Sequence, residues 1–167
     1  MNKLFSIILL TLVLLSCATV LPVDRAVEEI AWSTLDMISE NDKPVIAVYK
    51  LRDISENGDI SDMIVTRLTS ELANAARFEE REIVIVSRQT FNDIFLEQNF
   101  ILSDLTDQTK QIEIGKFLGA DLILTGDLTK IEEDIFNINT QLINIQTGEI
   151  IGGDTIDFWV ILPEEND

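Results

Sequence analysis

The chain has 167 residues, 12 of them Lys or Arg and 30 Asp or Glu, with a formal net charge of -18, one Cys and no His. This length predicts a single domain, and the lack of His excludes a Ser-His-Asp triad and an imidazole metal site. The strong acidity argues against binding to nucleic-acid phosphates or to anionic lipid headgroups. A hydrophobic fraction of 46% is too high for a disordered acidic chain, so the composition predicts a folded, non-catalytic domain.

Residues 1–16 have the pattern of a lipoprotein signal peptide. Lys3 precedes an apolar run over residues 4–15, which is shorter than the roughly 20 residues of a transmembrane helix. The tetrad Leu14-Leu15-Ser16-Cys17 resembles the bacterial lipobox, and Cys17 is the single cysteine. The resemblance implies diacylation of the Cys17 thiol with chains such as palmitate, cleavage before Cys17, and acylation of the new amino terminus. An ordinary secretory signal with a chance Cys is the alternative.

The segment after the signal predicts a short membrane tether. We expect residues 17–23 to form the acylated Cys and the tether, and residues 24–167 to form one domain close to its bilayer. Several acyl chains would hold such a protein stably. Ala18 favours the outer membrane by the enterobacterial sorting rule, so we expect a lipid-anchored envelope protein that faces the periplasm.

The first half of this domain predicts two helices and two strands. A helix is expected from Asp24, as N-cap, and a second helix is expected to be capped near Asp59 or Ser61. Residues 45–51 read VIAVYKL, a continuous apolar run that predicts a strand covered on both faces. Residues 83–86 predict a second buried strand.

The next segment predicts two short helices and a further strand. One helix is expected to begin at Ser87 and another to cover residues 109–118, where Gly119 ends it. Residues 122–125 predict a third buried strand that continues toward Ile131.

In the last third of the chain the spacing of apolar residues changes, and the new pattern predicts an antiparallel hairpin. Apolar and polar residues alternate over residues 136–142, as in a strand that is buried on one face and exposed to solvent on the other. A turn follows in which Gly148 can take a positive φ, and a return strand is expected over residues 149–161. The order of elements predicts an α/β (α+β) fold with a mixed sheet of about five strands and helices packed on it.

Three stretches resemble a known family: IVIVSRQTF at residues 83–91, IEIGKFLGADLILTG at residues 112–126, and LINIQTGE at residues 142–149. Together they resemble a superfamily of bacterial envelope lipoproteins that includes the curli secretion protein CsgG, the flagellar lipoprotein FlgO and the penicillin-binding-protein activator LpoB. Their shared domain is similar to the TolB amino-terminal or anticodon-binding fold. The resemblance covers roughly residues 44–157.

The build of the chain favours one member of this superfamily. The resemblance implies that a curli-type channel needs additional membrane-spanning hairpins and that the penicillin-binding-protein activator needs a long linker. Neither is visible in this sequence, so the compact FlgO type fits best. We therefore expect a non-catalytic interaction or assembly module for a flagellar or curli-like surface structure. The alternatives are a regulator of peptidoglycan synthesis and, less favoured, an envelope hydrolase that uses carboxylates.

No pattern predicts a catalytic residue, a cofactor or a metal site. The cluster at residues 132–134, Glu-Glu-Asp, has oxygen ligands suited to Ca²⁺, but a solvated turn explains it equally well. Residues 56–59 predict a turn and a helix cap, and residues 79–82 an exposed loop. Asp24 and Glu28 could act as an acid/base pair only in a cleft, and are otherwise charges favoured near a helix N-terminus.

The two tryptophans are the candidate interaction surface. Trp32 lies off the apolar stripe of the first helix. In the last strand Trp159 alternates with Phe158 and Val160, so one of these three large side chains is expected to face outward. One interpretation is that the first helix covers the last strand and packs Trp32 against Trp159 or its neighbours. The other is a surface for an envelope protein partner or a homo-oligomer.

Overall fold

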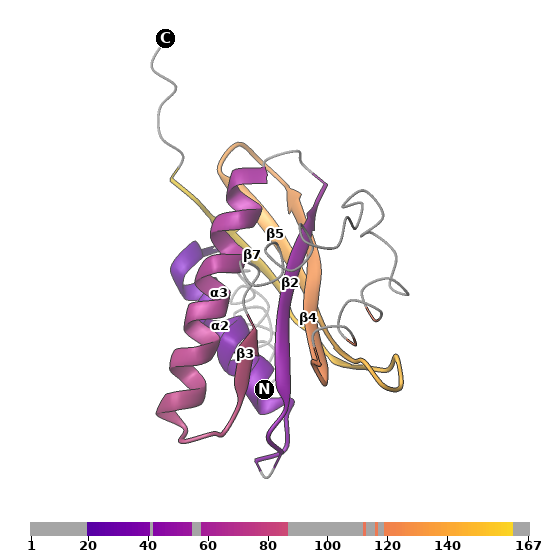
Figure 1. The fold of residues 1–167 in the computed structure, drawn as a ribbon. Helices are drawn as coiled ribbons and strands as arrows, with labels where there is room; N and C mark the ends of the chain where they lie inside the picture. Colours follow the sequence, from indigo (N-terminus) through magenta and orange to yellow (C-terminus); the bar gives the residue numbers. More distant parts are fainter. Residues whose placement is uncertain are drawn as a thin grey trace, which may run out of the picture.

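The computed structural model describes residues 20–40, 42–54, 58–86, 112, 116 and 119–161. In this part of the chain two helices pack on one face of a seven-stranded mixed sheet (Figure 1). The strand order is β1-β7-β5-β4-β2-β3, and β6 pairs with β5. The elements are β1 (Leu21–Pro22), α2 (Val23–Asp36), β2 (Val45–Asp53), α3 (Gly58–Phe78), β3 (Val84–Val86), β4 (Leu122–Lys130), β5 (Ile135–Asn144), β6 (Ile150–Gly152) and β7 (Thr155–Trp159). The predicted mixed α/β fold is confirmed.

Strand β2 lies inside the sheet, parallel to both β3 and β4. Its alternate residues Ile46 and Val48 belong to the core beneath the helices. Ala47 and Tyr49 are buried in a second apolar cluster, because successive side chains of a strand point to opposite faces. The prediction of a strand covered on both faces is therefore confirmed.

A β-bulge interrupts β2 after its first half. Val48 is paired with Leu124 and Leu51 with Gly126, so three steps along β2 match two along β4. The extra residue turns Leu51 back to the helix-bearing face, where it is 1% exposed. Arg52 then lies on the opposite face, where its guanidinium donates two hydrogen bonds of 2.8 and 3.0 Å to the Asp127 carboxylate.

The two helices begin differently from the sequence prediction. Helix α2 has Pro22 as its N-cap, without a capping side chain, and Asp24 instead forms an ion pair with Arg67 of α3. Ser61 is not a cap either, because it is fully buried within α3 and its hydroxyl donates a 3.1 Å hydrogen bond to the carbonyl of Leu51. Both side chains therefore join the helices to other elements, Asp24 to α3 and Ser61 to β2, and do not act as caps.

The segment after α3 is only partly the predicted exposed loop. Glu80 has a positive φ of 53°, and the amide of Arg81 donates to the carbonyl of Ala76, 2.8 Å away, which ends α3. The Arg81 guanidinium turns inward and donates to the carbonyls of Leu35, Ile38 and Ser39 at 3.3, 3.0 and 2.8 Å. Arg81 therefore caps the C-terminus of α2, where unpaired carbonyls accept from a cation.

The C-terminal hairpin forms as predicted, with a break in its return strand. Gly148 has φ 73° in the turn, as expected. The return strand is divided into β6 and β7 at Gly153 and Asp154, where the Asp154 amide binds the Thr140 side chain in place of the Thr140 carbonyl. The Thr140 amide donates to the Asp154 carbonyl at 2.8 Å, and the Asp154 amide donates to the Thr140 hydroxyl at 3.2 Å.

Three further predictions, for residues 83–86, residues 87–118 and the tether, have different outcomes. Strand β3 pairs only with β2 among the described strands, and Val84 is 56% exposed, so the prediction of a buried strand there is wrong for this edge. The helix expected from Ser87 lies outside the described residues, and of residues 109–118 only Ile112 and Lys116 are described, both helical. Strand β1 lies in the segment assigned to the tether and runs parallel to β7.

Candidate functional site

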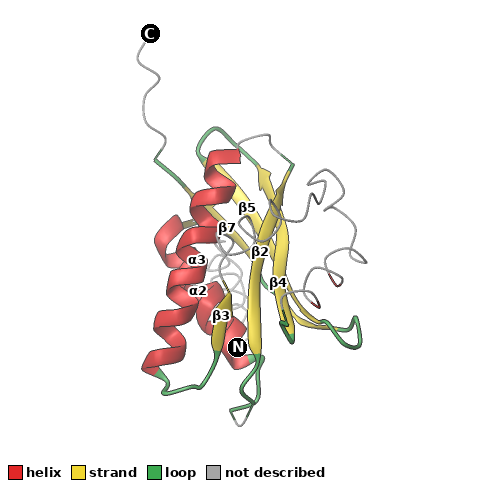
Figure 2. Ribbon diagram, viewed as in Figure 1, coloured by secondary structure: helices red, strands yellow, loops and turns green. Residues whose placement is uncertain are grey.

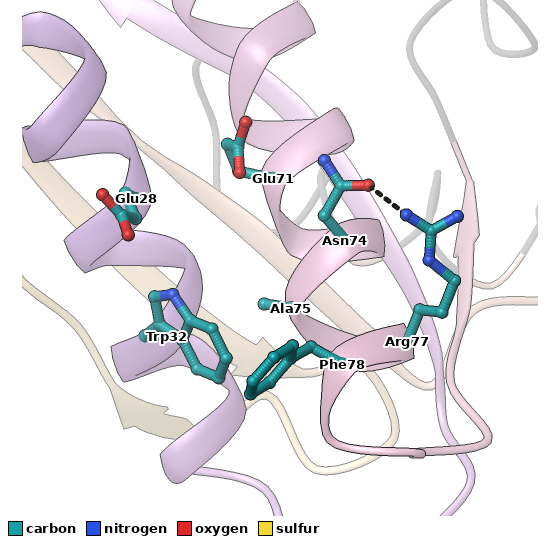
Figure 3. Close-up of a pocket in the computed structure, with 7 residues that line it drawn as sticks. All are labelled: Glu28, Trp32, Glu71, Asn74, Ala75, Arg77 and Phe78. Carbon is teal, nitrogen blue, oxygen red and sulfur yellow. Dashed lines mark hydrogen bonds between the residues drawn. The ribbon is translucent and has the colours of Figure 1, made fainter.

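Helices α2 and α3 lie side by side on one face of the sheet (Figure 2), and side chains of both line a hollow between them. Trp32 of α2 packs partly against the core, and its ring meets that of Phe78, the last residue of α3. The ring centroids are 5.7 Å apart and the planes are at 83°, an edge-to-face contact (Figure 3). Phe78 is 77% exposed, which is unusual for a ring of this size.

Trp32 separates two shallow hollows. The hollow on its α3 side has a volume of about 330 Å³, and the hollow along α2 about 380 Å³. We call the first hollow the Trp32 groove. It is lined by Glu28, Trp32, Glu71, Asn74, Ala75, Arg77 and Phe78 (Figure 3). The second is lined by Arg25, Glu28, Glu29, Trp32, Ser33 and Asp36.

Acidic groups outnumber basic ones around these hollows. The two linings together contain the acids Glu28, Glu29, Asp36 and Glu71 and the bases Arg25 and Arg77. Arg25 is engaged with Glu28 of its own helix at 2.6 Å, and Arg77 donates to the Asn74 side chain at 3.1 Å. The hydrogen bond to the neutral Asn74 amide leaves the charge of Arg77 in place, and the four acids against two bases still make the two linings together negative, as is the chain as a whole.

Trp159 lies on the opposite face of the sheet. Phe158, its neighbour, is buried beneath the helices and stacks on Phe136, so the alternation of β7 turns Trp159 outward, where it is 39% exposed. Packing of Trp32 against Trp159 itself is wrong for this reason, whereas α2 does contact β7, as that interpretation expected, and Trp32 packs against the core that contains Phe158 and Val160. The expectation that one large side chain of β7 faces outward is confirmed.

The carboxylates considered for catalysis or metal binding are not assembled into a site. Asp24 and Glu28 are each engaged by an arginine, Arg67 and Arg25 respectively, which leaves neither as a free acid/base partner of the other. Residues 132–134 form the exposed turn between β4 and β5. In the described ranges no group of three or more His, Cys, Asp or Glu side chains is arranged to hold a metal ion.

Two expected features lie outside the described residues: the acylation site Cys17, and residues 56 and 57 of the predicted turn. Among the helices of the described part, none combines the length and the apolar character that crossing a bilayer requires.

Sequence reasoning missed Phe78 and Arg81. Phe78 lies three residues after the buried Ala75, at the edge of the apolar stripe of α3, so the periodicity alone predicts a core residue and gives no signal of its exposure. Arg81 stands among three glutamates, so its inward course could be found only from the spatial closeness of the two helix ends.

These observations define a class: an acidic α/β domain with an exposed aromatic groove and without an assembled catalytic or metal site in its described part. The chain belongs to the family described as the peptidoglycan-synthase activator LpoB, whose model matches residues 22–154. A comparison with curated proteins found no match.

Solved structures agree with this family at the level of the fold. The LpoB C-terminal domain from Salmonella enterica is 19% identical, with a TM-score of 0.60, and the match covers 78% of this chain and 93% of that one. The same domain from Escherichia coli is 18% identical, with a TM-score of 0.59 and coverage of 78% and 96%. The E. coli LpoB structure solved by NMR is 19% identical, with a TM-score of 0.60, and the match covers 78% of this chain but 64% of that one.

The family match corrects the functional expectation. An assembly module for a flagellar or curli-like structure is wrong, because the matching family is that of a peptidoglycan-synthase activator, which was the alternative. The wider resemblance to the envelope-lipoprotein superfamily is confirmed through LpoB, whereas a FlgO-type build is not supported. The family is one of activators of an enzyme, so the expectation that the chain is not itself an enzyme is confirmed.

Proposed function

We propose that this chain is a cell-envelope lipoprotein that activates a peptidoglycan synthase by binding to it. The family match over residues 22–154 carries the proposal, and it spans the fold from α2 to β6 and ends just before β7. The agreement of that fold with the LpoB C-terminal domains supports it. The chain covers about two thirds of the E. coli LpoB chain, so activation is proposed for the globular domain and its partner is inferred from the family.

Activation by binding needs no catalytic group on the activator. A ligand shifts an enzyme between conformations only by its difference in affinity for them, so a chain that binds the active form more tightly raises its population. Exposed aromatic residues are enriched in the cores of protein–protein interfaces. The described domain has such residues in Trp32, Phe78 and Trp159.

The proposed anchor is the acylated Cys17, with the domain facing the periplasm and the outer membrane as the proposed location. Since Leu21 already pairs with Phe158 in the sheet, only residues 17–20 would remain as tether. Extended, they would reach about 14 Å at roughly 3.5 Å per residue. The synthase region that the chain binds must therefore approach the anchoring membrane closely.

Co-purification tests the proposal. The full chain, purified in detergent and carrying an affinity tag at its C-terminus, is mixed with a detergent-solubilised peptidoglycan synthase from the same cells. We expect the synthase to be retained with the chain and to be released at high salt. If every synthase of the organism passes through with a folded chain on the support, the proposal fails.

A further inference from the structure

We propose that the Trp32 groove is the docking site for the synthase, and that it accepts a basic segment bearing one large apolar side chain. The inference rests on the proposed function, because the synthase is taken as the partner. It adds the location of the contact and the chemistry of the partner segment, which the family match does not supply.

The apolar part of the groove is already in place for an anchor residue. Trp32 is held by the core behind it and by the edge-to-face contact with Phe78, so its ring does not have to be ordered on binding. Ala75, 4% exposed, lies on α3 one turn before Phe78, beside the two rings, and its small side chain leaves the hollow open (Figure 3). A pre-ordered aromatic pocket is typical of the few residues that dominate binding energy.

The rim favours a cationic partner. Glu71 comes from α3 and Glu28 from α2, so acidic groups flank the groove on both sides (Figure 3). Arg77 is the one basic residue of the lining, and Glu28 is paired with Arg25, so Glu71 is the acid of the groove that is left for a cationic partner. Glu79 and Glu80 follow Phe78 directly and are exposed. Complementary potential steers association and rejects partners of like charge.

The same charge argues against the other occupants of an apolar groove. A second copy would bring an equally acidic rim against this one, on a chain of net charge -18. Phosphate-rich polymers and anionic lipid surfaces are disfavoured for the same reason. A basic protein segment is the class that remains.

The face around Trp159 is the competing surface, and its polar groups are largely engaged with each other. Arg52 binds Asp127 through two hydrogen bonds, and the Asn137 amide donates to Asp157 at 2.7 Å. Trp159 is only 39% exposed, half the fraction of Phe78. This face therefore offers less free charge and less accessible aromatic surface than the Trp32 groove.

The test uses matched pairs of variants of the full chain in detergent, and measures the dissociation constant for the solubilised synthase. Phe78→Ser removes the exposed ring of the groove, and Ile161→Ser removes an apolar side chain that is 81% exposed elsewhere. Glu71→Lys reverses a charge in the groove, and Glu133→Lys makes the same change in the β4–β5 turn. We expect both groove variants to bind at least about tenfold more weakly, as for interface hot spots, and both controls to bind within about twofold of the parent.

Each other outcome overturns a stated part of the inference. If the parent chain binds but Phe78→Ser binds equally well, the groove is not the site; a loss on Trp159→Ser instead would place docking on the opposite face. If Phe78→Ser weakens binding and Glu71→Lys does not, the basic partner is wrong. If Phe78→Ser converts a sedimenting dimer of the chain to a monomer, the occupant is a second copy. Failure of the parent chain to bind contradicts the proposed function itself.

Discussion

Trp32 of α2 and Phe78 of α3 meet edge to face with ring centroids 5.7 Å apart, and the two rings form one wall of a groove whose rim is acidic. The contact joins a partly buried ring to a ring that is 77% exposed. Phe78 can therefore be changed with little effect on the core, which makes the groove open to direct experiment.

Replacing Phe78 by Ala should lower the free energy of unfolding by only about 1 kcal/mol, the worth of an aromatic pair beyond its buried area. Phe136→Ala is the contrast, since Phe136 is fully buried and stacks on Phe158, and should cost about 3–5 kcal/mol. Urea unfolding followed by tryptophan fluorescence measures both. Equal losses for the two variants would mean that Phe78 is a core residue.

Replacing Arg81 by Ala should lower the free energy of unfolding by about 2 kcal/mol, because three carbonyls at the end of α2 lose a charged donor. Arg77→Ala is the matched control, since Arg77 is exposed and binds only the neighbouring Asn74 side chain among the contacts described. Thermal and urea unfolding should separate the two variants. A stable Arg81→Ala protein would show that solvent replaces the guanidinium at no cost.

Replacing Gly126 by Ala should destabilise the fold by about 3 kcal/mol or more, since the new Cβ would lie 2.1 Å from the carbonyl oxygen of Asn139 and the strands would have to separate. Gly152→Ala meets only the flexible side chain of Met37, at 2.7 Å, and should be milder. Soluble yield and urea midpoints compare the two. The reverse ranking would contradict the close approach of β4 and β5 at Gly126.

Cys17→Ala should abolish incorporation of radiolabelled palmitate and release the chain from the membrane fraction, because its thiol is the proposed acylation site. Ser16→Ala is the control, since it keeps the thiol and a small preceding residue. Equal labelling of the parent chain and Cys17→Ala, or no labelling of either, would rule out lipidation at this residue.

The sequence predicts the elements of this fold better than their contacts. The apolar run at residues 45–51 and the alternation at residues 136–142 report burial directly, because each follows the period of a strand. The bulge that returns Leu51 to the helix-bearing face has no such periodic signal. It depends on pairing with β4, which lies about 70 residues further along the chain.

The candidate site was harder to predict from the sequence for the same reason, because its contacts join residues that are far apart in the chain. Trp32 stands out by its place off the apolar stripe, but its partner Phe78 and the cap supplied by Arg81 come from α3 and the turn after it. The functional expectation failed because it was drawn from the length of the tether. The family model matches residues 22–154, which begin after the proposed tether of residues 17–20, so the length of the tether does not bear on the match.

The most direct test of the account is the rate at which a peptidoglycan synthase of the same organism polymerises glycan strands, measured with and without the full chain in detergent. We predict that the rate rises with the concentration of the chain and saturates, as expected when binding shifts the enzyme to its active conformation. A rate that stays unchanged at concentrations where the synthase is fully retained by the chain would contradict activation.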